Sequence, residues 1–386
     1  MSKQIHDIGV LISTTGSYGN VGETILNGCM LACEEIRADP SLSVELSPLH
    51  LDPGGDPLQY VKCMQQLISR GIRHIVGCYT SISRKEVLPT LEKHNALLFY
   101  PTHYEGFEIS EHVIYTGASP NHHTSPLIGY LVKNHGTRAF CIGSNYIWAW
   151  ESNRTLREGL QAHRAKVLTE RYLPVGETDM QDIIESIFQS QPDFIFNTLI
   201  GESSYEFFRQ FRKACLARGI DQPSRFPIAS CNLSEADLEC IGTEACDGHI
   251  SSSVYFASLD TSQNQRFVQA YRKRFPNGPA VSVETEASYI ATWLLAYGLQ
   301  ATGGSDSMAL REAIQAKPLL APQGRVWIDG ENLHAWLTPR LASSMKDFSF
   351  RITEEAPQPV RPDPYMLNTQ DDTEMGLTFP RLRIVS

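Results

Sequence analysis

The chain has 386 residues, of which 42% are hydrophobic and 20% charged, and its formal net charge is −10 at pH 7. The composition is that of an ordinary globular protein, and the length exceeds that of one usual core, so two lobes are expected. The net charge is negative, and no block of the sequence is rich in lysine and arginine. Both features argue against a nucleic-acid-binding surface.

The N-terminus and the cysteines predict the compartment. The first residues, MSKQIHD, pass directly into a strand-like run without the apolar core of a signal peptide. The nine cysteines are odd in number and include no CxxC pair, which is typical of buried, reduced thiols. No stretch approaches the roughly 20 apolar residues of a membrane span. We therefore expect a cytoplasmic protein that does not contact a membrane.

Short apolar runs alternate with amphipathic stretches through the first 117 residues. This order predicts a parallel sheet covered by helices. The expected strands are 7–13, 44–51, 73–77, 96–100 and 113–117, and the expected helices are 22–37, 58–70 and 83–94.

The same alternation restarts in the second part of the chain, which predicts a second α/β lobe. The expected strands are 138–144, 166–173, 193–200, 226–230 and 248–256, with helices at 125–134, 152–163, 179–190 and 203–218. Three more helices (261–275, 284–301, 306–317), a hairpin of 324–329 with 334–341 and a proline-rich end follow.

These patterns predict two doubly wound lobes formed from separated parts of the chain. Residues 1–118 with 250–330 are assigned to an N-terminal lobe and 119–249 with about 331–352 to a C-terminal lobe, and 353–386 are expected to form an extended C-terminal strap.

Several motifs have features of catalytic, nucleotide or metal sites. The loop GSYGNVG (16–22) has GxxGxxG spacing, and Asp52 follows its last glycine by 30 residues rather than the usual ~20, which favours a turn over a dinucleotide site. DPGGDP (52–57) fits a turn followed by a helix cap. The neighbours His122 and His123 lack an HExxH or Cys/His cluster, and no GxSxG elbow occurs. We expect no metal, no cofactor and no catalytic residue.

The segment GCYTSISRKEVLP (77–89) allows three interpretations: a phosphate cradle, an activated serine or a pocket wall. The segment lacks the run of glycines that a phosphate cradle needs. The spacing of the histidines does not identify one of them as a base for Ser81 or Ser83. Arg84 and Lys85 are expected to point to solvent or to pair with acids. A pocket wall is therefore the favoured interpretation.

Polar and aromatic side chains follow three predicted strands. In open α/β sheets, ligands bind beyond the carboxyl ends of the strands. Because these residues offer hydroxyls and ring faces but neither a carboxylate pair nor a cationic clamp, the expected ligand is small, neutral and able both to donate and to accept hydrogen bonds. The candidates are Tyr79, Ser81, Tyr100, Thr102, Tyr104, Tyr146 and Trp148.

Six segments resemble one known family over about residues 7–366: LDPGGDP, VGCYTSISRKEVLP, YPTHYEGFE, IGSNYIWAWESNR, APQGRVWID and RPDPY. They are similar to the cytoplasmic amide receptors that regulate aliphatic amidase operons (the AmiC type) and to the related urea and short-chain-amide binding proteins of ABC transporters. The resemblance implies an α/β type I periplasmic-binding-protein fold, in which a hinge with three crossovers joins two lobes that close on a ligand.

The resemblance also implies a function without catalysis. It predicts a receptor for a small amide that controls an RNA-binding antitermination regulator through ligand-dependent lobe closure. The alternative is a urea or short-chain-amide binding subunit of an ABC transporter. An amidohydrolase or dehydrogenase is a third hypothesis, and a homo-oligomer is compatible with the family. The implied amide contacts are Tyr79, Ser81, Tyr100, Thr102 and Tyr146, with Tyr104 as a weaker match.

The sequence departs from this family pattern at three places. His103 stands where proline is expected, and Trp148 stands where tyrosine is expected. The segment ASCNLSEADL (229–238) lacks the paired threonines of its counterpart, which leaves Asn232 as the polar contact. These changes alter the volume and polarity of the pocket, so the ligand is expected to be urea, formamide or a different small amide.

Overall fold

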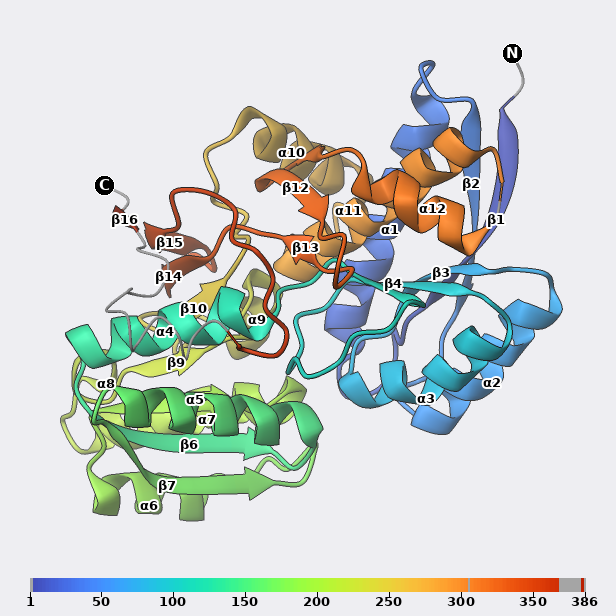
Figure 1. Cartoon of the computed structure of the whole chain (residues 1–386). Coiled ribbons are helices and arrows are strands. Elements are labelled where there is room, and N and C mark those ends of the chain that lie inside the picture. Colours follow the sequence, from blue (N-terminus) through green and yellow to red (C-terminus); the bar gives the residue numbers. More distant parts are fainter. Residues whose placement is uncertain (1–2, 305, 368–382, 385–386) are drawn as a thin grey trace. The chain divides into compact units, whose positions relative to one another are not determined.

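The structure, a computed structural model, describes residues 3–304, 306–367 and 383–384 (Figure 1). The chain divides into two units, each with its own sheet and core. Unit 1 contains residues 1–104, 108–118 and 259–337, and unit 2 contains residues 105–107, 119–258 and 338–386. No helix of the described ranges has the length and apolar character needed to cross a membrane.

The main sheet of unit 1 has five parallel strands in the order β2-β1-β3-β4-β5. Its last three strands are buried along their whole length, which explains their continuous apolar runs. The strands are β1 (Gln4–Leu11), β2 (Val44–Leu51), β3 (His74–Gly77), β4 (Leu97–Tyr100) and β5 (Val113–Tyr115).

Helices cover this sheet, with α1 packed against α11 and α2 packed against α3. The contact between the two longest helices is close, because a Cβ on Gly28 would lie 2.2 Å from the carbonyl oxygen of Thr285. The helices are α1 (Gly19–Ala38), α2 (Pro57–Ser69), α3 (Ser81–Lys93), α10 (Ser262–Arg274), α11 (Val283–Thr302) and α12 (Ser307–Gln315). A small antiparallel sheet joins β11 (Leu319–Ala321), β12 (Gly324–Ile328) and β13 (Ala335–Trp336).

A buried arginine lies at the centre of a tyrosine cluster in unit 1. Arg84, on α3, has no exposed surface. Its guanidinium carbon lies 4.6 Å from the ring centroid of Tyr100, 4.7 Å from that of Tyr104 and 5.9 Å from that of Tyr115. These are cation–π distances, and removal from water strengthens such contacts. The cluster therefore ties α3 to the last two strands of the sheet.

Glu108 supplies the negative charge that Arg84 needs inside the protein. Its carboxylate accepts hydrogen bonds from the Nε of Arg84 (2.7 Å), the Nζ of Lys85 (2.7 Å) and the hydroxyl of Tyr115 (2.8 Å). Burial alone would raise the pKa of Glu108, but the charge and hydrogen bonds of Arg84 and Lys85 outweigh burial and lower this pKa to about 2. Arg84 and Lys85 are expected from the sequence either to point to solvent or to pair with acids. In the structure both pair with Glu108.

The sheet of unit 2 has eight strands in the order β16-β15-β14-β10-β9-β8-β6-β7. Strands β6 to β10 are parallel, and β14 pairs antiparallel to β10. The strands are β6 (Arg138–Ser144), β7 (Lys166–Leu173), β8 (Phe194–Thr198), β9 (Ile228–Ser230), β10 (Ile250–Ser253), β14 (Arg340–Ser344), β15 (Phe350–Glu355) and β16 (Arg383–Ile384). The helices are α4 (Pro120–Asn134), α5 (Ile147–Ala162), α6 (Gln181–Ser190), α7 (Gly201–Ala217), α8 (Gln222–Arg225) and α9 (Glu235–Ile241).

An extended segment, residues 356–367, follows β15 and contacts the start of α4. The side-chain amide of Asn121 donates to the carbonyl of Arg361 (2.8 Å), and its oxygen accepts from the backbone N–H of Asp363 (2.9 Å). The Nε2 of His122 lies 3.0 Å from the carbonyl oxygen of Val360. One of the two adjacent histidines, His122, therefore contacts the extended segment.

The same segment contacts residues 105–107, the short part of unit 2 that interrupts unit 1 in sequence. The backbone N–H of Phe107 donates to the carbonyl of Pro364 (2.8 Å). Gly106 has φ of +82°, and a Cβ there would lie 2.4 Å from the same oxygen. Only glycine satisfies both the left-handed backbone and this close approach.

The division of the chain differs from the predicted one at three places. Residues 250–258 belong to unit 2, because β10 pairs with β9 and β14. Residues 331–337 belong to unit 1, because β13 pairs with β12. The expected strap from 353 begins inside β15, and residues 368–382 and 385–386 of it lie outside the described residues.

Glu108→Gln tests the buried ion pair. The lowered folded-state pKa of Glu108 means that its stabilisation is present above its ordinary pKa of 4.5 and is lost as the pH falls towards about 2. We expect the variant to lose roughly 3 kcal/mol of unfolding free energy at pH 7, and less at pH 3. Urea unfolding at both pH values measures this difference.

Glu111→Gln is the matched control, because Glu111 pairs with Arg311 at the surface with 82% of its side chain exposed. Its loss is expected to stay within ~0.5 kcal/mol. A loss in Glu108→Gln that is equal at both pH values would contradict the assigned charge on Glu108.

Candidate functional site

The candidate site in unit 1 lies beyond the carboxyl ends of β3 and β4, where α3 begins. Gly77 and Cys78 make the turn out of β3, and Cys78 adopts a left-handed φ of +59° that is uncommon for a residue with a side chain. The backbone N–H of Cys78 donates to the carbonyl of Leu11 (2.8 Å). This turn presents the next residues at the edge of the sheet, and such backbone conformations often mark functional sites.

Helix α3 begins at Ser81, two residues before the predicted start. Thr80 caps it, because its hydroxyl accepts from the backbone N–H of Ser83 (3.2 Å). The hydroxyl of Ser83 donates back to the carbonyl of Thr80 (2.7 Å). Ser83 is therefore part of the cap, and Ser81, 2% exposed, is the serine that opens the helix.

Three other predicted residues lie beside Ser81. The hydroxyl of Tyr100 donates to the backbone carbonyl of Tyr79 (2.7 Å), so Tyr100 fixes the loop that follows β3. The hydroxyl of Thr102 lies 3.4 Å from the carbonyl oxygen of Cys78. The ring of Tyr79 packs against that of Tyr18, with centroids 5.2 Å apart. Tyr79, Ser81 and Thr102 thus come together at one edge.

Tyr104 occupies a different place from the other predicted contacts. Its ring is fully buried in the Arg84 cluster, and its hydroxyl donates to the carbonyl of Glu108 (3.0 Å) and lies 2.5 Å from the Nε2 of His334. A side chain engaged in this way supports the core. Among the residues predicted in unit 1, Tyr104 is therefore the one whose contacts fit a pocket wall least well.

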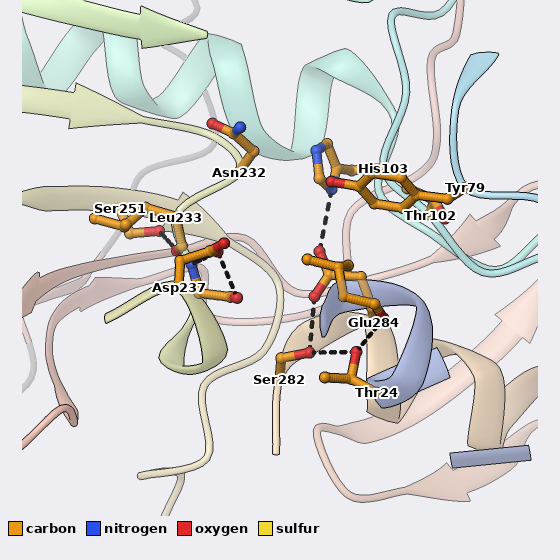
Figure 2. A network of polar contacts seen from close by, with 12 residues as sticks. Thr24, Tyr79, Thr102, His103, Asn232, Leu233, Asp237, Ser251, Ser282 and Glu284 are labelled. Atoms are coloured by element: carbon orange, nitrogen blue, oxygen red, sulfur yellow. Dashed lines mark hydrogen bonds and ion pairs between the residues drawn. The ribbon is translucent and has the colours of Figure 1, made fainter. Parts of the chain in front are cut away.

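A polar chain that the motifs did not predict adjoins this edge (Figure 2). The Nδ1 of His103 lies 3.7 Å from the Oε1 of Glu284, and the hydroxyl of Ser282 donates to the Oε2 of Glu284 (2.8 Å). Ser282 also contacts the hydroxyl of Thr24 (3.3 Å). The loop after β4, the start of α11 and helix α1 therefore meet at this network.

His103 and Glu284 are 9% and 3% exposed. Burial lowers the pKa of His103 to about 4, so the ring is neutral near pH 7. The approach of 3.7 Å is therefore a contact between a neutral ring and a carboxyl group.

Unit 2 carries the remaining predicted residues at the ends of its own strands. Tyr146 is the N-cap residue of α5 after β6, and its ring stacks against that of Trp148 with centroids 6.2 Å apart. Asn232 follows β9, and its amide donates to the carbonyl of Leu199 at the end of β8 (2.9 Å). Trp148 is 3% exposed, whereas Tyr146 and Asn232 are half-buried.

A second polar group in unit 2 follows Asn232 in sequence. Asp237 accepts from the backbone N–H and the hydroxyl of Ser234 (2.8 and 2.7 Å) and from the hydroxyl of Tyr205 (2.8 Å). Ser251 donates to the carbonyl of Leu233 (2.7 Å). These bonds cap α9 and fix the loop that carries Asn232. Burial raises the pKa of Asp237, although the bonds from Ser234 and Tyr205 act in the opposite direction.

The described residues contain no group of three or more His, Cys, Asp or Glu side chains that could hold a metal ion.

Comparison with known proteins places this arrangement in a family. A family model described as "Periplasmic binding protein domain" matches residues 6–371. Leu/Ile/Val-binding protein homolog 6 of Brucella abortus (strain 2308) is 23% identical over 288 residues, which are 73% of each protein. The leucine-, isoleucine-, valine-, threonine- and alanine-binding protein of Pseudomonas aeruginosa is 19% identical over 345 residues, 88% of this chain and 87% of that protein.

A solved structure shows the same fold. The solute binding protein of an ABC transporter from Rhodopseudomonas palustris HaA2, in complex with p-hydroxybenzoic acid, superposes with a TM-score of 0.85 at 20% identity, over 95% of this chain and 100% of that one. The predicted α/β type I periplasmic-binding-protein fold is therefore confirmed. The chain belongs to the periplasmic binding protein family, and the three relatives described above are named as binding proteins.

The predicted cytoplasmic location is wrong. The family description and the ABC-transporter relatives point to the periplasm instead. The prediction relied partly on unpaired cysteines, and seven of the nine are buried. Burial keeps such thiols from oxidants and partners in any compartment, so their free state does not identify the cytoplasm.

His103→Gln tests the neutral buried ring. A histidine whose folded pKa is below its ordinary value of 6.5 costs stability as the pH falls from 6.5 towards 4, because the unfolded chain takes up the proton first. We expect the variant to lose less unfolding free energy than the parent between pH 7 and pH 5, by roughly 1–2 kcal/mol. Urea unfolding at the two pH values measures the difference.

His94→Gln, at the end of α3 and only half-buried, is the control and is expected to keep the pH response of the parent. If His103→Gln showed the same pH response as the parent, the neutral state of His103 would be the wrong assignment.

Proposed function

We propose that the chain is the solute-binding component of an ABC-type transporter and that its solute is a small amide or urea. The observation that supports this most is the convergence of Tyr79, Ser81, Thr102 and His103 beyond the carboxyl ends of β3 and β4. This is the edge of an open α/β sheet at which ligands bind. The family membership supports binding over catalysis.

The chemistry of this edge favours an uncharged polar solute. Ser81 and Thr102 bring hydroxyls that can donate or accept, and Tyr79 brings an aromatic wall. Arg84 and Lys85, the two cations of the same segment, both bind Glu108. This carboxylate compensates one of their two positive charges and holds both side chains within the protein.

The choice among solutes rests on the sequence as well as on the fold. The Rhodopseudomonas palustris protein is described in complex with p-hydroxybenzoic acid, and the Brucella and Pseudomonas proteins are named for amino acids. The segments around Tyr79, Tyr100 and Tyr146 instead resemble amide and urea receptors. Control of an RNA-binding antitermination regulator draws no support from the relatives, which are named for solute binding. Ligand-dependent closure stays a prediction.

A panel of acetamide, propionamide, formamide and urea tests this function. We expect at least one of them to raise the melting temperature of the full chain at millimolar concentration. Calorimetry then gives its affinity. Ser81→Ala is expected to weaken that affinity by roughly 1–3 kcal/mol, because a buried hydrogen bond is lost.

Ser83→Ala is the matched control in the same turn, because the Ser83 hydroxyl bonds to the side chain and the carbonyl of Thr80 within the cap. It is expected to lower stability and to leave the affinity unchanged. The proposal fails if no member of the panel shifts the melting temperature. If Ser81→Ala binds as tightly as Ser83→Ala, Ser81 does not contact the ligand.

A further inference from the structure

We propose that unit 1 carries a second ligand site, on the outer face of the small sheet β11-β12-β13, and that this site takes an aromatic carboxylate. Its main parts are the guanidinium of Arg325 and the ring of Trp327, both on β12. The site uses none of the residues at the edge of β3 and β4. It goes beyond the proposed function, and each of the two can be tested without the other.

The small sheet has one buried face and one open face (Figure 1). Exposure alternates along each of its strands, as expected for a sheet with a single covered side. Strand β11 contacts α10 and α11, and β12 contacts α12, so the covered side belongs to the core of unit 1. The residues of the covered side, each at most 9% exposed, are Leu319, Ala321, Val326, Ile328 and Ala335. The residues of the open side are Leu320, Arg325, Trp327 and Trp336.

The open side presents a fixed aromatic wall. Trp327 pairs with Trp336 across the two strands, and their rings stack with centroids 5.0 Å apart. The Nε1 of Trp336 donates to the Oδ2 of Asp329 (3.1 Å), which holds the Trp336 ring in place. Trp327 therefore lies against a ring that is itself anchored. A rigid, half-exposed indole of this kind offers a flat surface to a ligand ring at little cost in conformational entropy.

A cavity of about 300 Å³ adjoins this wall and is lined by Gln315, Pro318, Arg325 and Trp327. Gln315 is the last residue of α12, and Pro318 directly precedes β11. The volume is at the lower end of the range for small-molecule sites, which suits a ligand with one ring. The lining combines two ring surfaces, from tryptophan and proline, with one cation and one amide.

Arg325 brings a positive charge that the protein does not neutralise. Within the described ranges its side chain is exposed and forms neither an ion pair nor a hydrogen bond. Asp329, the acid closest to it on the same hairpin, instead accepts from Trp336 and from the backbone N–H groups of Glu331 (3.0 Å) and Asn332 (3.3 Å). A free guanidinium offers paired N–H donors that match a carboxylate.

The two halves of the site together define the ligand class. A carboxylate bound by Arg325 places an attached flat ring within the same cavity as the indole of Trp327, since both side chains line it. A small anion without a ring would leave the aromatic wall uncovered, and a neutral ring would leave the guanidinium without a partner. An aromatic carboxylate satisfies both groups.

Calorimetry on the full chain at pH 7 tests the site with three probes. Benzoate has both the ring and the charge, acetate lacks the ring, and benzyl alcohol lacks the charge. We expect the parent protein to bind benzoate at least about tenfold more tightly than either of the other probes. Arg325→Gln is expected to weaken benzoate binding by about tenfold or more, because the charge-assisted hydrogen bonds are lost.

Arg272→Gln is the matched control, because Arg272 is an exposed arginine of α10 that does not line the cavity. It is expected to keep the benzoate affinity of the parent. Since Arg325 is exposed, Arg325→Gln is expected to keep the melting temperature of the parent, which shows that the variant is folded. It is also expected to keep the parent's response to the panel of amides and urea.

Several results would overturn the site while leaving the proposed function intact. They are a parent that does not bind benzoate, equal benzoate affinities of the parent and Arg325→Gln, and an equal loss in Arg272→Gln. Acetate that binds as tightly as benzoate would overturn the assigned ligand class. A dimer in light scattering that Leu320→Glu converts into monomers would show that a second copy covers this face instead. Failure of the amide panel would overturn the proposed function without affecting this site.

Discussion

The ion pair between Arg84 and Glu108 is the constraint on which the strand edge with Tyr79, Ser81 and Thr102 depends. Arg84 is fully buried, and a charge in that position is tolerated only with a partner and with the faces of three tyrosines around it. The helix that carries Arg84 begins at Ser81, and Glu108 lies in the loop between β4 and β5 that also carries Thr102 and His103. One interaction therefore connects both segments that present polar groups at the edge.

Much of the fold could be predicted because buried parallel strands read as unbroken apolar runs. Strand β6, which is buried almost throughout, has the predicted bounds, and so do the half-buried edge strands β2 and β7. The alternation of strands with helices identified both sheets. The prediction of the lobe boundaries failed where strands that pair are distant in sequence. Strand β10 is the short polar stretch ISSS, in which Ser251 and Ser252 are buried because they donate to carbonyl groups of other segments. No local pattern shows that β10 pairs with β14, so residues 250–258 were placed in the other lobe.

The candidate site could be proposed from the sequence where it lies in continuous motifs, and its role in ligand binding stays a prediction. Tyr79, Ser81 and Thr102 follow strands directly, and strand ends meet at one edge of a sheet. Tyr104 has the same residue type and a similar position, but its hydroxyl bonds to groups inside the core. The sequence alone could not distinguish this role from that of a pocket wall. Glu284 was missed because it is far from His103 in the chain and looks like an ordinary acidic residue in the first turn of a helix. The departure from the family pattern at His103 was the signal that could have prompted a search for its partner.

The interleaving of the two units along the chain has a consequence for biosynthesis. The bond from Ser288 to the carbonyl of Ile25 spans 263 residues, and that from Asn121 to Arg361 spans 240. When the first 258 residues have been synthesised, neither unit is complete, since unit 1 needs residues up to 337 and unit 2 needs those after 337. Such long-range contacts fold late. Neither unit can therefore fold fully while these residues emerge from the ribosome, and chaperones can bind the nascent chain during that interval.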